Sequence, residues 1–315
     1  MYAKTSKIVI AILISVIISF SVFLIFMNYA NPIVLAENNF YSKEFSDDKK
    51  IIFILGSSYI GQIDTNKINS LYLNATNEYE VYNLSIHSDQ PKKRIKIIEK
   101  VISLKPNLII YGIGFNDLGI YEPKSSPIDI KEFFSNSFTL EEIWNIRQSP
   151  KDITLDVILN VITHSSFSSR DEYNPFYPQK IPVMSKIRTN DEFQKIFDDN
   201  IVSVVDHIPE FNKNENAIAL DKIIQKVKNN NIEIIIFSAP YNKIYLEEAG
   251  SEKIENFRNL LNFIGNSNNV LTFDFLEKYA ELDIWADPSH VAYNNNKTMI
   301  YSQDIAKIIQ EEIEN

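Results

Sequence analysis

Short, mostly apolar runs alternate with helix-like stretches along most of this 315-residue chain, and no other feature restricts its fold as strongly. The predicted strands are residues 51–55, 79–84, 107–111, 232–237 and 270–273. Continuous apolar strands separated by helices are typical of a parallel sheet that is buried on both faces. The sequence therefore predicts an α/β fold, a three-layer sandwich around a central parallel sheet.

The segments between these strands show the periodicity of amphipathic helices. The predicted helices are residues 60–76, 90–104, 217–229, 251–263 and 296–313. In the second of them Ile95, Ile98 and Ile102 share one face, and lysines occupy the other. Residues 120–210 break this rhythm, because they are rich in proline and aromatic residues and lack glycine. We interpret that stretch as a mostly helical insertion packed over the carboxyl edge of the sheet.

The N-terminus contains a long apolar run. From Ile8 to Met27 the chain has no charged residue, and a helix of that length spans about 30 Å, the thickness of the hydrocarbon core of a bilayer. Two lysines precede the run, and the first charge after it is Glu37. Positive residues favour the cytoplasmic side, which leaves the N-terminus inside and the rest of the chain outside the cytoplasm.

We therefore predict a single-pass membrane protein with an extracytoplasmic domain. A cleaved signal peptide is the alternative, but its apolar core would be unusually long and no clear Ala-x-Ala site follows. The predicted organisation is a membrane anchor at 1–36, a linker at 37–49 and one large domain at 50–315 with its insertion at 120–210.

The overall composition excludes several classes of function. A net charge of -10 argues against a nucleic-acid partner, because binding phosphates requires a basic surface. The absence of cysteine excludes disulfides, thiolate catalysis and thiolate metal sites. The four histidines are dispersed, so we expect no metal site and no cofactor.

Four short segments, far apart in the chain, carry residues suited to one active site. They are Gly56-Ser57-Ser58, Asn83 to Asp89, Gly114 to Asp117, and Asp287 to His290. The chain has only seven glycines, and five of them lie between residues 56 and 119, two of these within the segments. Three of the segments follow predicted strands, whose carboxyl ends meet at one edge of a parallel sheet. We therefore expect the segments to lie close together.

The residue types in these segments indicate nucleophilic catalysis. A serine hydroxyl is a poor nucleophile until a base takes its proton. Ser58 follows the turn at Gly56, and His290 is the candidate base. Asp287 lies three residues before His290, on a turn or a first helical turn, where it can accept the other N–H of the imidazole. We predict Ser58, His290 and Asp287 as a catalytic triad.

The same segments offer donors for the oxyanion of a tetrahedral intermediate. Asn116 provides a side-chain amide, and Ser58 and Ser88 provide backbone N–H groups. Loss of one such donor typically costs about 3 kcal/mol of transition-state stabilisation. Taken alone, each segment is more often a helix cap, a turn or a loop. The hypothesis of an active site depends on their joint order.

In that order the segments resemble the SGNH hydrolases, which are GDSL-type esterases and acyl transferases on a flavodoxin-like sheet. The family's blocks are Gly-Asp-Ser, a glycine N–H donor, Gly-x-Asn-Asp and Asp-x-x-His. The matching residues are Gly56 to Ser58, Gly114 to Asp117 and Asp287 to His290. The resemblance covers about 50–118 and 215–313 and leaves out the anchor and the insertion.

Two positions depart from the family pattern. Ser57 replaces the usual aspartate, so either serine can be the nucleophile, and the alignment on Gly56 favours Ser58. Ser88 stands where glycine is expected, so its N–H survives while the local φ is not assured. The Gly-Ser-Ser form behind an N-terminal anchor is similar to lipoteichoic-acid D-alanylation and polysaccharide acetyl-transfer proteins.

The resemblance implies a serine esterase or O-acyltransferase that works through an acyl-Ser58 intermediate. Its expected substrate is an acyl ester of a cell-surface glycan, of a lipid-linked carbohydrate or of a small molecule. One alternative is a catalytically inactive module that keeps the fold to bind carbohydrate or a partner. A second is a cytoplasmic esterase whose first segment does not span a membrane.

Overall fold

The strands of the central sheet form where the sequence is richest in β-branched and aromatic residues. In the computed structural model they are β1 (Lys50–Leu55), β2 (Tyr79–Asn83), β3 (Leu108–Ile113), β4 (Glu233–Ser238) and β5 (Thr272–Phe273). All neighbours pair in parallel, in the order β2-β1-β3-β4-β5. This doubly wound, flavodoxin-like order reverses direction between β1 and β3. The prediction of an α/β fold around a parallel sheet is confirmed.

The structure describes residues 13–21, 39–45, 48–73, 78–86, 88–120, 186–198, 204–293 and 296–313. The chain divides into two compact units, residues 1–40 with 123–169 and residues 41–122 with 170–315. The sheet and all four segments of the predicted site belong to the second unit.

Most of the predicted membrane anchor lies outside the described residues. Within it, residues 13–21 are helical, and apolar side chains such as Leu13 and Phe20 are exposed. No helix in the described part of the chain combines the length and the apolar character needed to cross a bilayer. The predicted insertion also lies largely outside the described residues, and its described part includes the helix α10 (Asn190–Asp198).

The strands β1, β3 and β4 form the buried centre of the sheet. In their register Ile52 lies beside Leu108, and Ile110 lies beside Ile235. Almost every side chain of the three strands is buried, because helices cover both faces. This burial explains why the runs show no alternation of polar and apolar residues.

Two strand ends differ from the prediction by two residues, and other ends agree or differ by one. β3 continues through Gly112 to Ile113, because both residues still pair with β4. β5 is shorter than predicted, because only Thr272 and Phe273 pair with β4 at the edge of the sheet.

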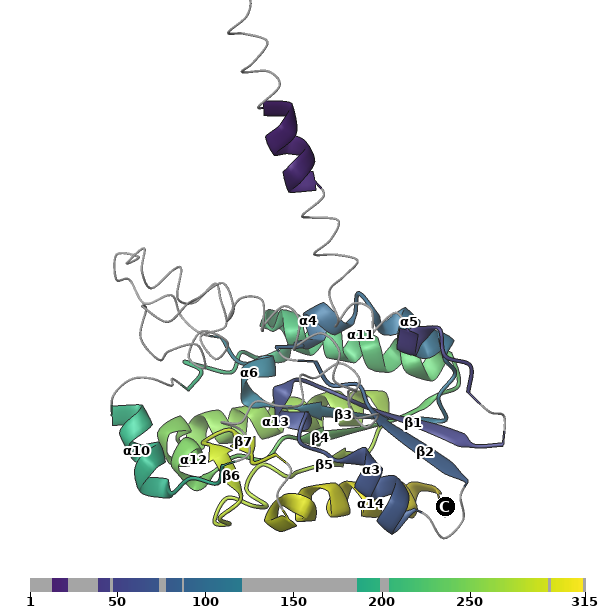
Figure 1. Ribbon diagram of the computed structural model, residues 1–315. Coiled ribbons are helices and arrows are strands. Elements are labelled where there is room, and N and C mark those ends of the chain that lie inside the picture. Colours follow the sequence, from purple (N-terminus) through teal and green to yellow (C-terminus); the bar gives the residue numbers. More distant parts are fainter. Residues whose placement is uncertain are drawn as a thin grey trace, which may run out of the picture. The chain divides into compact units, whose positions relative to one another are not determined.

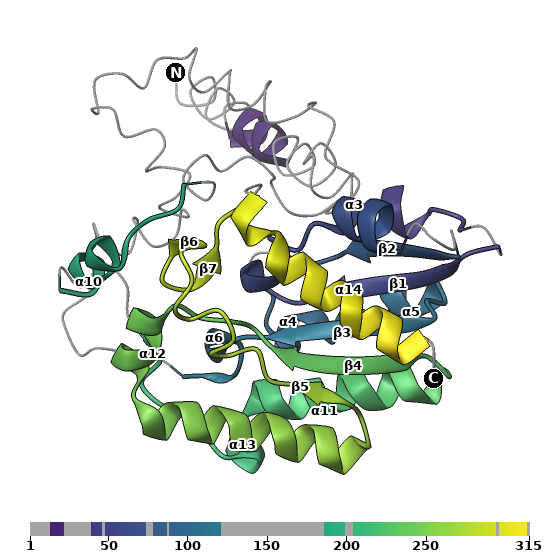
Figure 2. The same cartoon turned by 90° about the horizontal axis from the view of Figure 1, so that it is seen from below.

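The helices lie in two layers, one on each face of the sheet (Figures 1 and 2). The first face carries α3 (Thr65–Lys67), η2 (Ile68–Tyr72) and α14 (Met299–Ile313). The opposite face carries α4 (Pro91–Arg94), α5 (Ile98–Ser103) and α11 (Glu215–Asn229). There α13 (Ser251–Asn268) packs against α11. The remaining helices are η1 (Ser58–Ile60), α6 (Phe115–Leu118), η4 (Phe211–Lys213), α12 (Lys243–Ala249) and η5 (Asn296–Thr298).

The predicted helix 60–76 is wrong, because the chain forms three short turns there, η1, α3 and η2. The side-chain amide of Asn83 donates hydrogen bonds to the carbonyls of Ile60 and Ile63, at 2.8 and 3.0 Å. The Ile60 carbonyl also accepts the N–H of Ile63, three residues on, at 3.1 Å, so the chain forms a tight turn here and not a continuous α-helix. Asp64 then caps a new helix by accepting a hydrogen bond from the N–H of Lys67.

The predicted helix 90–104 is interrupted between α4 and α5. At Lys96 and Ile97 the backbone N–H groups bond to carbonyls three residues earlier, at 3.2 and 3.0 Å. Arg94 is fully buried. Its guanidinium bonds to Asp89 and to the carbonyl of Leu84, and this contact draws the helix inward.

Candidate active site

Ser58 lies at the carboxyl end of β1, on the first residue of η1. Between strand and turn stands Gly56 with φ at +146°, a conformation that side chains other than glycine rarely adopt. A Cβ there would also lie 2.4 Å from Ile60 and 2.6 Å from the carbonyl oxygen of Gly112. Glycine therefore lets the chain reverse sharply and present Ser58 at the edge of the sheet, beside the switch between β1 and β3.

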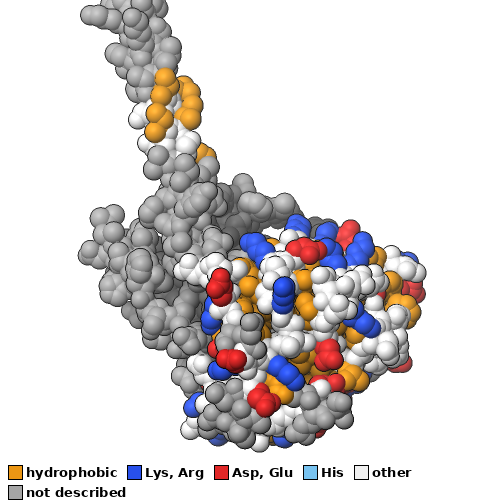
Figure 3. All heavy atoms as spheres, turned by 90° about the vertical axis from the view of Figure 1, so that its right-hand side faces the viewer, with side chains coloured by type: hydrophobic (Ala, Val, Ile, Leu, Met, Phe, Trp, Pro, Cys, Tyr) orange, Lys and Arg blue, Asp and Glu red, His pale blue; other side chains and the backbone are white. Residues whose placement is uncertain are grey.

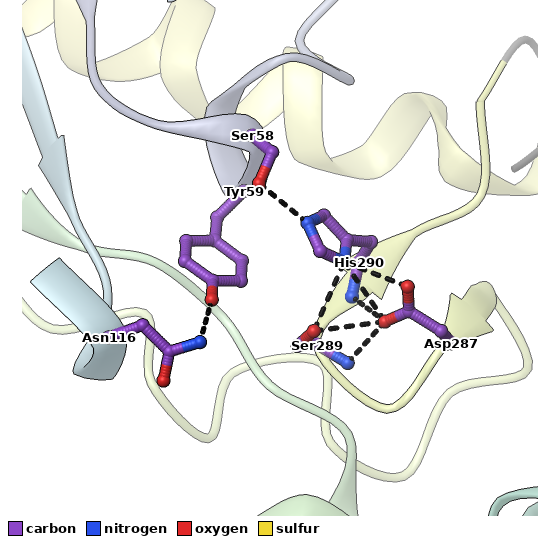
Figure 4. A network of polar contacts seen from close by, with 6 residues as sticks. All are labelled: Ser58, Tyr59, Asn116, Asp287, Ser289 and His290. Carbon is purple, nitrogen blue, oxygen red and sulfur yellow. Dashed lines mark hydrogen bonds and ion pairs between the residues drawn. The ribbon is translucent and has the colours of Figure 1, made fainter. Parts of the chain in front are cut away.

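The hydroxyl of Ser58 meets the imidazole of His290 (Figure 4). Ser58 Oγ lies 2.8 Å from His290 Nε2, although 232 positions separate the two residues. On the other side of the ring, His290 Nδ1 lies 2.9 and 3.0 Å from the two carboxylate oxygens of Asp287. A proton on Nδ1 that is donated to Asp287 leaves Nε2 free to accept the proton of Ser58.

A small β-hairpin holds the acid and the base in place. β6 (Trp285–Asp287) pairs antiparallel with β7 (His290–Val291), so the expected turn joins Asp287 to His290 and the last helix begins later. The backbone N–H groups of Ser289 and His290 both donate to Asp287 Oδ1, at 2.7 and 2.8 Å. These bonds orient the carboxylate before any substrate is present.

The same contacts keep Asp287 ionised. Burial raises the pKa of its carboxyl, but the charge and hydrogen bond of His290 and the bonds from Ser289 outweigh burial and hold the pKa below its ordinary value. A quarter of the side chain is exposed, so water also stabilises the charged form. Asp287 is therefore a carboxylate that can stabilise a neighbouring imidazolium.

The two adjacent serines have different partners. Ser57 is buried, and its hydroxyl donates a hydrogen bond to Asp117 Oδ2 at 3.1 Å. Asp117 also accepts the N–H of Gly114 at 2.7 Å. Burial raises the pKa of Asp117 to about 7, although these two hydrogen bonds lower it. Ser57 thus connects the first segment to the third. Of these two adjacent serines, only Ser58 bonds to the imidazole of His290.

The second segment presents Ser88 in an uncommon backbone conformation. Its φ is +55°, in the left-handed region where glycine is usual. Its neighbours are tied to the other segments, since the N–H of Ile86 donates to the carbonyl of Gly56 at 3.1 Å and Gln90 Nε2 donates to the carbonyl of Asn116 at 3.0 Å. Ser88 itself is exposed, and no hydrogen bond joins it to Ser58.

The backbone N–H groups predicted as oxyanion donors are available. Neither the N–H of Ser58 nor that of Ser88 donates a hydrogen bond to another described residue. For Ser58 this follows from its place in the first turn of η1, where an N–H has no partner within the helix.

Asn116 is arranged differently from the prediction. Its Nδ2 donates to the hydroxyl of Tyr59, and its Oδ1 accepts a hydrogen bond from the hydroxyl of Tyr245 at 3.2 Å. The structure shows no hydrogen bond between Asn116 and Ser58. The sequence interpretation missed both tyrosines. Tyr59 could have been noticed as the residue after the nucleophile, whereas nothing in the sequence marks Tyr245.

A cavity of about 730 Å³ lies at the opposite, amino-terminal edge of the sheet. Its lining includes Lys50, Asn107 and Glu233, at or beside the starts of three strands, and contains no histidine. Figure 3 faces this edge, where basic and acidic side chains are interspersed. The hydroxyl and imidazole therefore lie away from this hollow. Among the described residues, no group of histidine and acidic side chains is arranged to hold a metal ion.

Comparison with known proteins gives limited information. No protein-family model matches the chain, and no curated protein sequence matches it. Among solved structures it is similar to the psychrotrophic esterase EstA from Pseudoalteromonas sp., with a TM-score of 0.45 and 12% identity over 85% of this chain and 100% of that chain. It is also similar to TesA, with a TM-score of 0.36 and 10% identity over 71% of this chain and 77% of that chain. With TM-scores below 0.5, neither likeness bears on the activity of this chain.

Proposed function

We propose that this protein is an SGNH-type serine esterase or O-acyltransferase in which Ser58 is the nucleophile. The observation that carries the proposal is the chain of contacts from Ser58 Oγ through His290 to the carboxylate of Asp287. Such a relay is what an activated hydroxyl requires, and the side chains of His290 and Asp287 are both partly exposed.

The reaction begins when Ser58 Oγ attacks the carbonyl carbon of an ester and its proton passes to His290 Nε2. The carbonyl oxygen becomes an oxyanion, and the N–H groups of Ser58 and Ser88 and the amide of Asn116 are its proposed donors. The C–O bond to the alcohol then breaks, and the imidazolium returns its proton to the leaving oxygen. Asp287 stabilises the imidazolium throughout.

A second nucleophile completes the cycle. Water attacking the acyl-Ser58 ester gives hydrolysis, and a sugar hydroxyl gives transfer. In both cases His290 accepts the proton of the attacking oxygen and returns it to Ser58 Oγ as the bond between the acyl group and Oγ breaks. We propose a surface glycan or lipid-linked carbohydrate ester as substrate. The support is the apolar run 8–27 behind two lysines, which favours an anchored protein with its site outside the cytoplasm.

A fluorophosphonate probe on the purified full-length protein tests the nucleophile. We expect labelling of the wild-type protein and of the Ser57→Ala variant, whose lost hydroxyl bonds only Asp117. Ser58→Ala should abolish it. Labelling that persists in Ser58→Ala, or that is lost only in Ser57→Ala, would show that Ser58 is not the nucleophile.

An unlabelled wild-type protein would favour the alternative of a catalytically inactive binding module. Binding of acetylated glycans without turnover, measured by calorimetry, would then support that alternative. The membrane location has its own test, because an anchored protein stays with the membrane fraction after a carbonate wash. Release by carbonate would contradict the anchor and leave the proposed chemistry untouched.

A further inference from the structure

Tyr59 lies between the two sides of the proposed site (Figure 4). It follows Ser58 in η1, and only 6% of the residue is exposed. We propose that Tyr59 is a positioning residue, which sets the imidazole plane of His290 with its ring and the amide plane of Asn116 with its hydroxyl. The proposal rests on the proposed function, because there both groups act on one acyl centre.

The ring of Tyr59 stacks on the imidazole of His290. The two ring centroids are 4.8 Å apart, and the planes differ by 22°. This contact covers one face of the imidazole and prevents it from tilting out of line with Ser58 Oγ. An aromatic face also favours the imidazolium that forms when the proton of Ser58 is transferred. Ser58, Asp287 and Ser289 also contact the imidazole, and they do so at its edge.

The hydroxyl of Tyr59 determines how the amide of Asn116 is oriented. It accepts a hydrogen bond from Asn116 Nδ2, while Tyr245 donates to Asn116 Oδ1. Because two phenols bond to opposite ends of one planar amide, the plane of the amide is fixed. The second hydrogen on Nδ2 lies in the same plane, so its direction is set by Tyr59 as well.

The backbone is shaped to admit this ring. A Cβ at Gly114 would lie 2.7 Å from Cδ2 of Tyr59 and 2.5 Å from the hydroxyl of Tyr241. Both distances are too short for any side chain other than hydrogen. The ring centroids of Tyr59 and Tyr241 are 5.4 Å apart, so Tyr241 supports the ring from behind. Gly114, in the third segment, therefore leaves the space that the ring of Tyr59 occupies.

This arrangement predicts a specific kinetic effect. Removing the hydroxyl frees one end of the Asn116 amide, and removing the whole ring also frees the imidazole. Small misplacements of reacting groups can lower a rate by about 10²-fold. We expect a loss in kcat rather than a rise in KM, because both groups act on the transition state.

The experiment compares Tyr59→Phe, Tyr59→Leu and the control Tyr279→Phe. Tyr279 is a buried tyrosine whose hydroxyl bonds Asp304, away from the site. With 4-nitrophenyl acetate we expect kcat to fall about tenfold in Tyr59→Phe and about 100-fold in Tyr59→Leu, with KM within about twofold and no change in the control. Tyr59→Phe removes a single oxygen atom, so it remains a test even where Tyr59→Leu fails to fold.

A second measurement does not depend on turnover. In the Ser58→Ala protein, the ring of Tyr59 should shift the NMR resonance of the His290 Cε1 proton upfield. We expect the shift to persist in the double variant Ser58→Ala with Tyr59→Phe, which keeps an aromatic ring. It should vanish in the double variant Ser58→Ala with Tyr59→Leu, which has no ring. A wild-type protein that does not react with esters would refute the proposed function, while the NMR result would still decide whether the rings stack in solution.

Four results would overturn the inference. A kcat in Tyr59→Phe equal to that of the wild type would contradict the role of the Tyr59 hydroxyl in orienting the Asn116 amide. A kcat in Tyr59→Leu equal to that of the wild type would contradict the role of the ring at the imidazole. So would a His290 Cε1 proton resonance that is the same in Ser58→Ala with and without Tyr59→Leu. Faster fluorophosphonate labelling in Tyr59→Leu would show instead that the ring obstructs the site.

Discussion

The base side and the oxyanion side of the site are assembled to different degrees. On the base side Ser58, His290 and Asp287 already bond to one another without a substrate. On the oxyanion side the N–H groups of Ser58 and Ser88 donate to no described residue, and the amide of Asn116 is held by two tyrosines. The members of the base side bond to one another, whereas the proposed donors of the oxyanion side do not.

This difference has a physical cause. A hydroxyl, an imidazole and a carboxylate are donors and acceptors for each other, so they order one another in the empty site. Oxyanion donors face a charge that exists only during the reaction, and their position must come from the backbone. Here it comes from the first turn of η1 and from the left-handed conformation of Ser88. Four substitutions test this contrast.

His290→Ala removes the centre of the base side and should have the largest effect. We expect turnover of 4-nitrophenyl acetate to fall by about 10⁴-fold or more, because no other group near Ser58 takes its proton. His207→Ala, at an exposed histidine whose backbone bridges to Ile120, is the control and should keep full activity. Substantial turnover in His290→Ala would contradict the assignment of His290 as the base.

Asn116→Ala tests the oxyanion side and should have a smaller effect, about 10²- to 10³-fold in kcat. KM should change little, because the contact strengthens only in the transition state. Asn256→Ala on the exposed face of α13 provides the matched control. If Asn116→Ala raises KM and leaves kcat intact, its role is substrate binding and the oxyanion assignment is wrong.

Asp117, in the third segment, bonds to Ser57 of the first segment, and its effect is on stability. Its pKa is about 7 when folded and near 3.8 when unfolded, so the folded state binds more protons between these values and loses stability as pH rises through them. The loss is on the order of a few kcal/mol. In Asp117→Asn, whose amide oxygen can accept the same bonds, urea unfolding should show a flatter dependence of stability between pH 4 and pH 7. An unchanged slope would show that Asp117 is ionised at low pH.

Ser88→Gly should have the smallest effect. Glycine relieves the left-handed φ but makes the unfolded chain more flexible, so we expect a gain of at most about 1 kcal/mol in the free energy of unfolding. Turnover should stay within about twofold, because glycine keeps the N–H. Ser88→Val is the matched control and should lose both stability and activity, since β-branched residues resist positive φ. A Ser88→Gly protein with little activity would mean that the serine side chain itself acts.

Much of the fold was predictable because local composition decides it. The runs at β1, β3 and β4 are apolar without alternation, which only a sheet covered on both faces explains. The helix predicted at 60–76 failed for a reason outside its own sequence. The amide of Asn83, on the neighbouring strand, bonds to the carbonyls of Ile60 and Ile63 and stabilises the tight turn that forms there in place of a helix.

The candidate site divides in the same way. The order of the four segments placed Ser58, Ser88 and Asn116 at one edge of the sheet, because parallel strands end together. No pattern in the sequence could show that Tyr59 and Tyr245 hold Asn116, since these contacts join side chains from η1, α6 and α12.

The sequence by itself determined the parallel sheet and the set of residues that gather at its carboxyl edge, because apolar runs and strand ends are local properties. The tertiary structure decided which serine meets the imidazole and how Asn116 is held. It also decided that Ser88 adopts a glycine-like φ. Each of these depends on contacts between segments far apart in the chain, and such contacts exist only after the segments have packed.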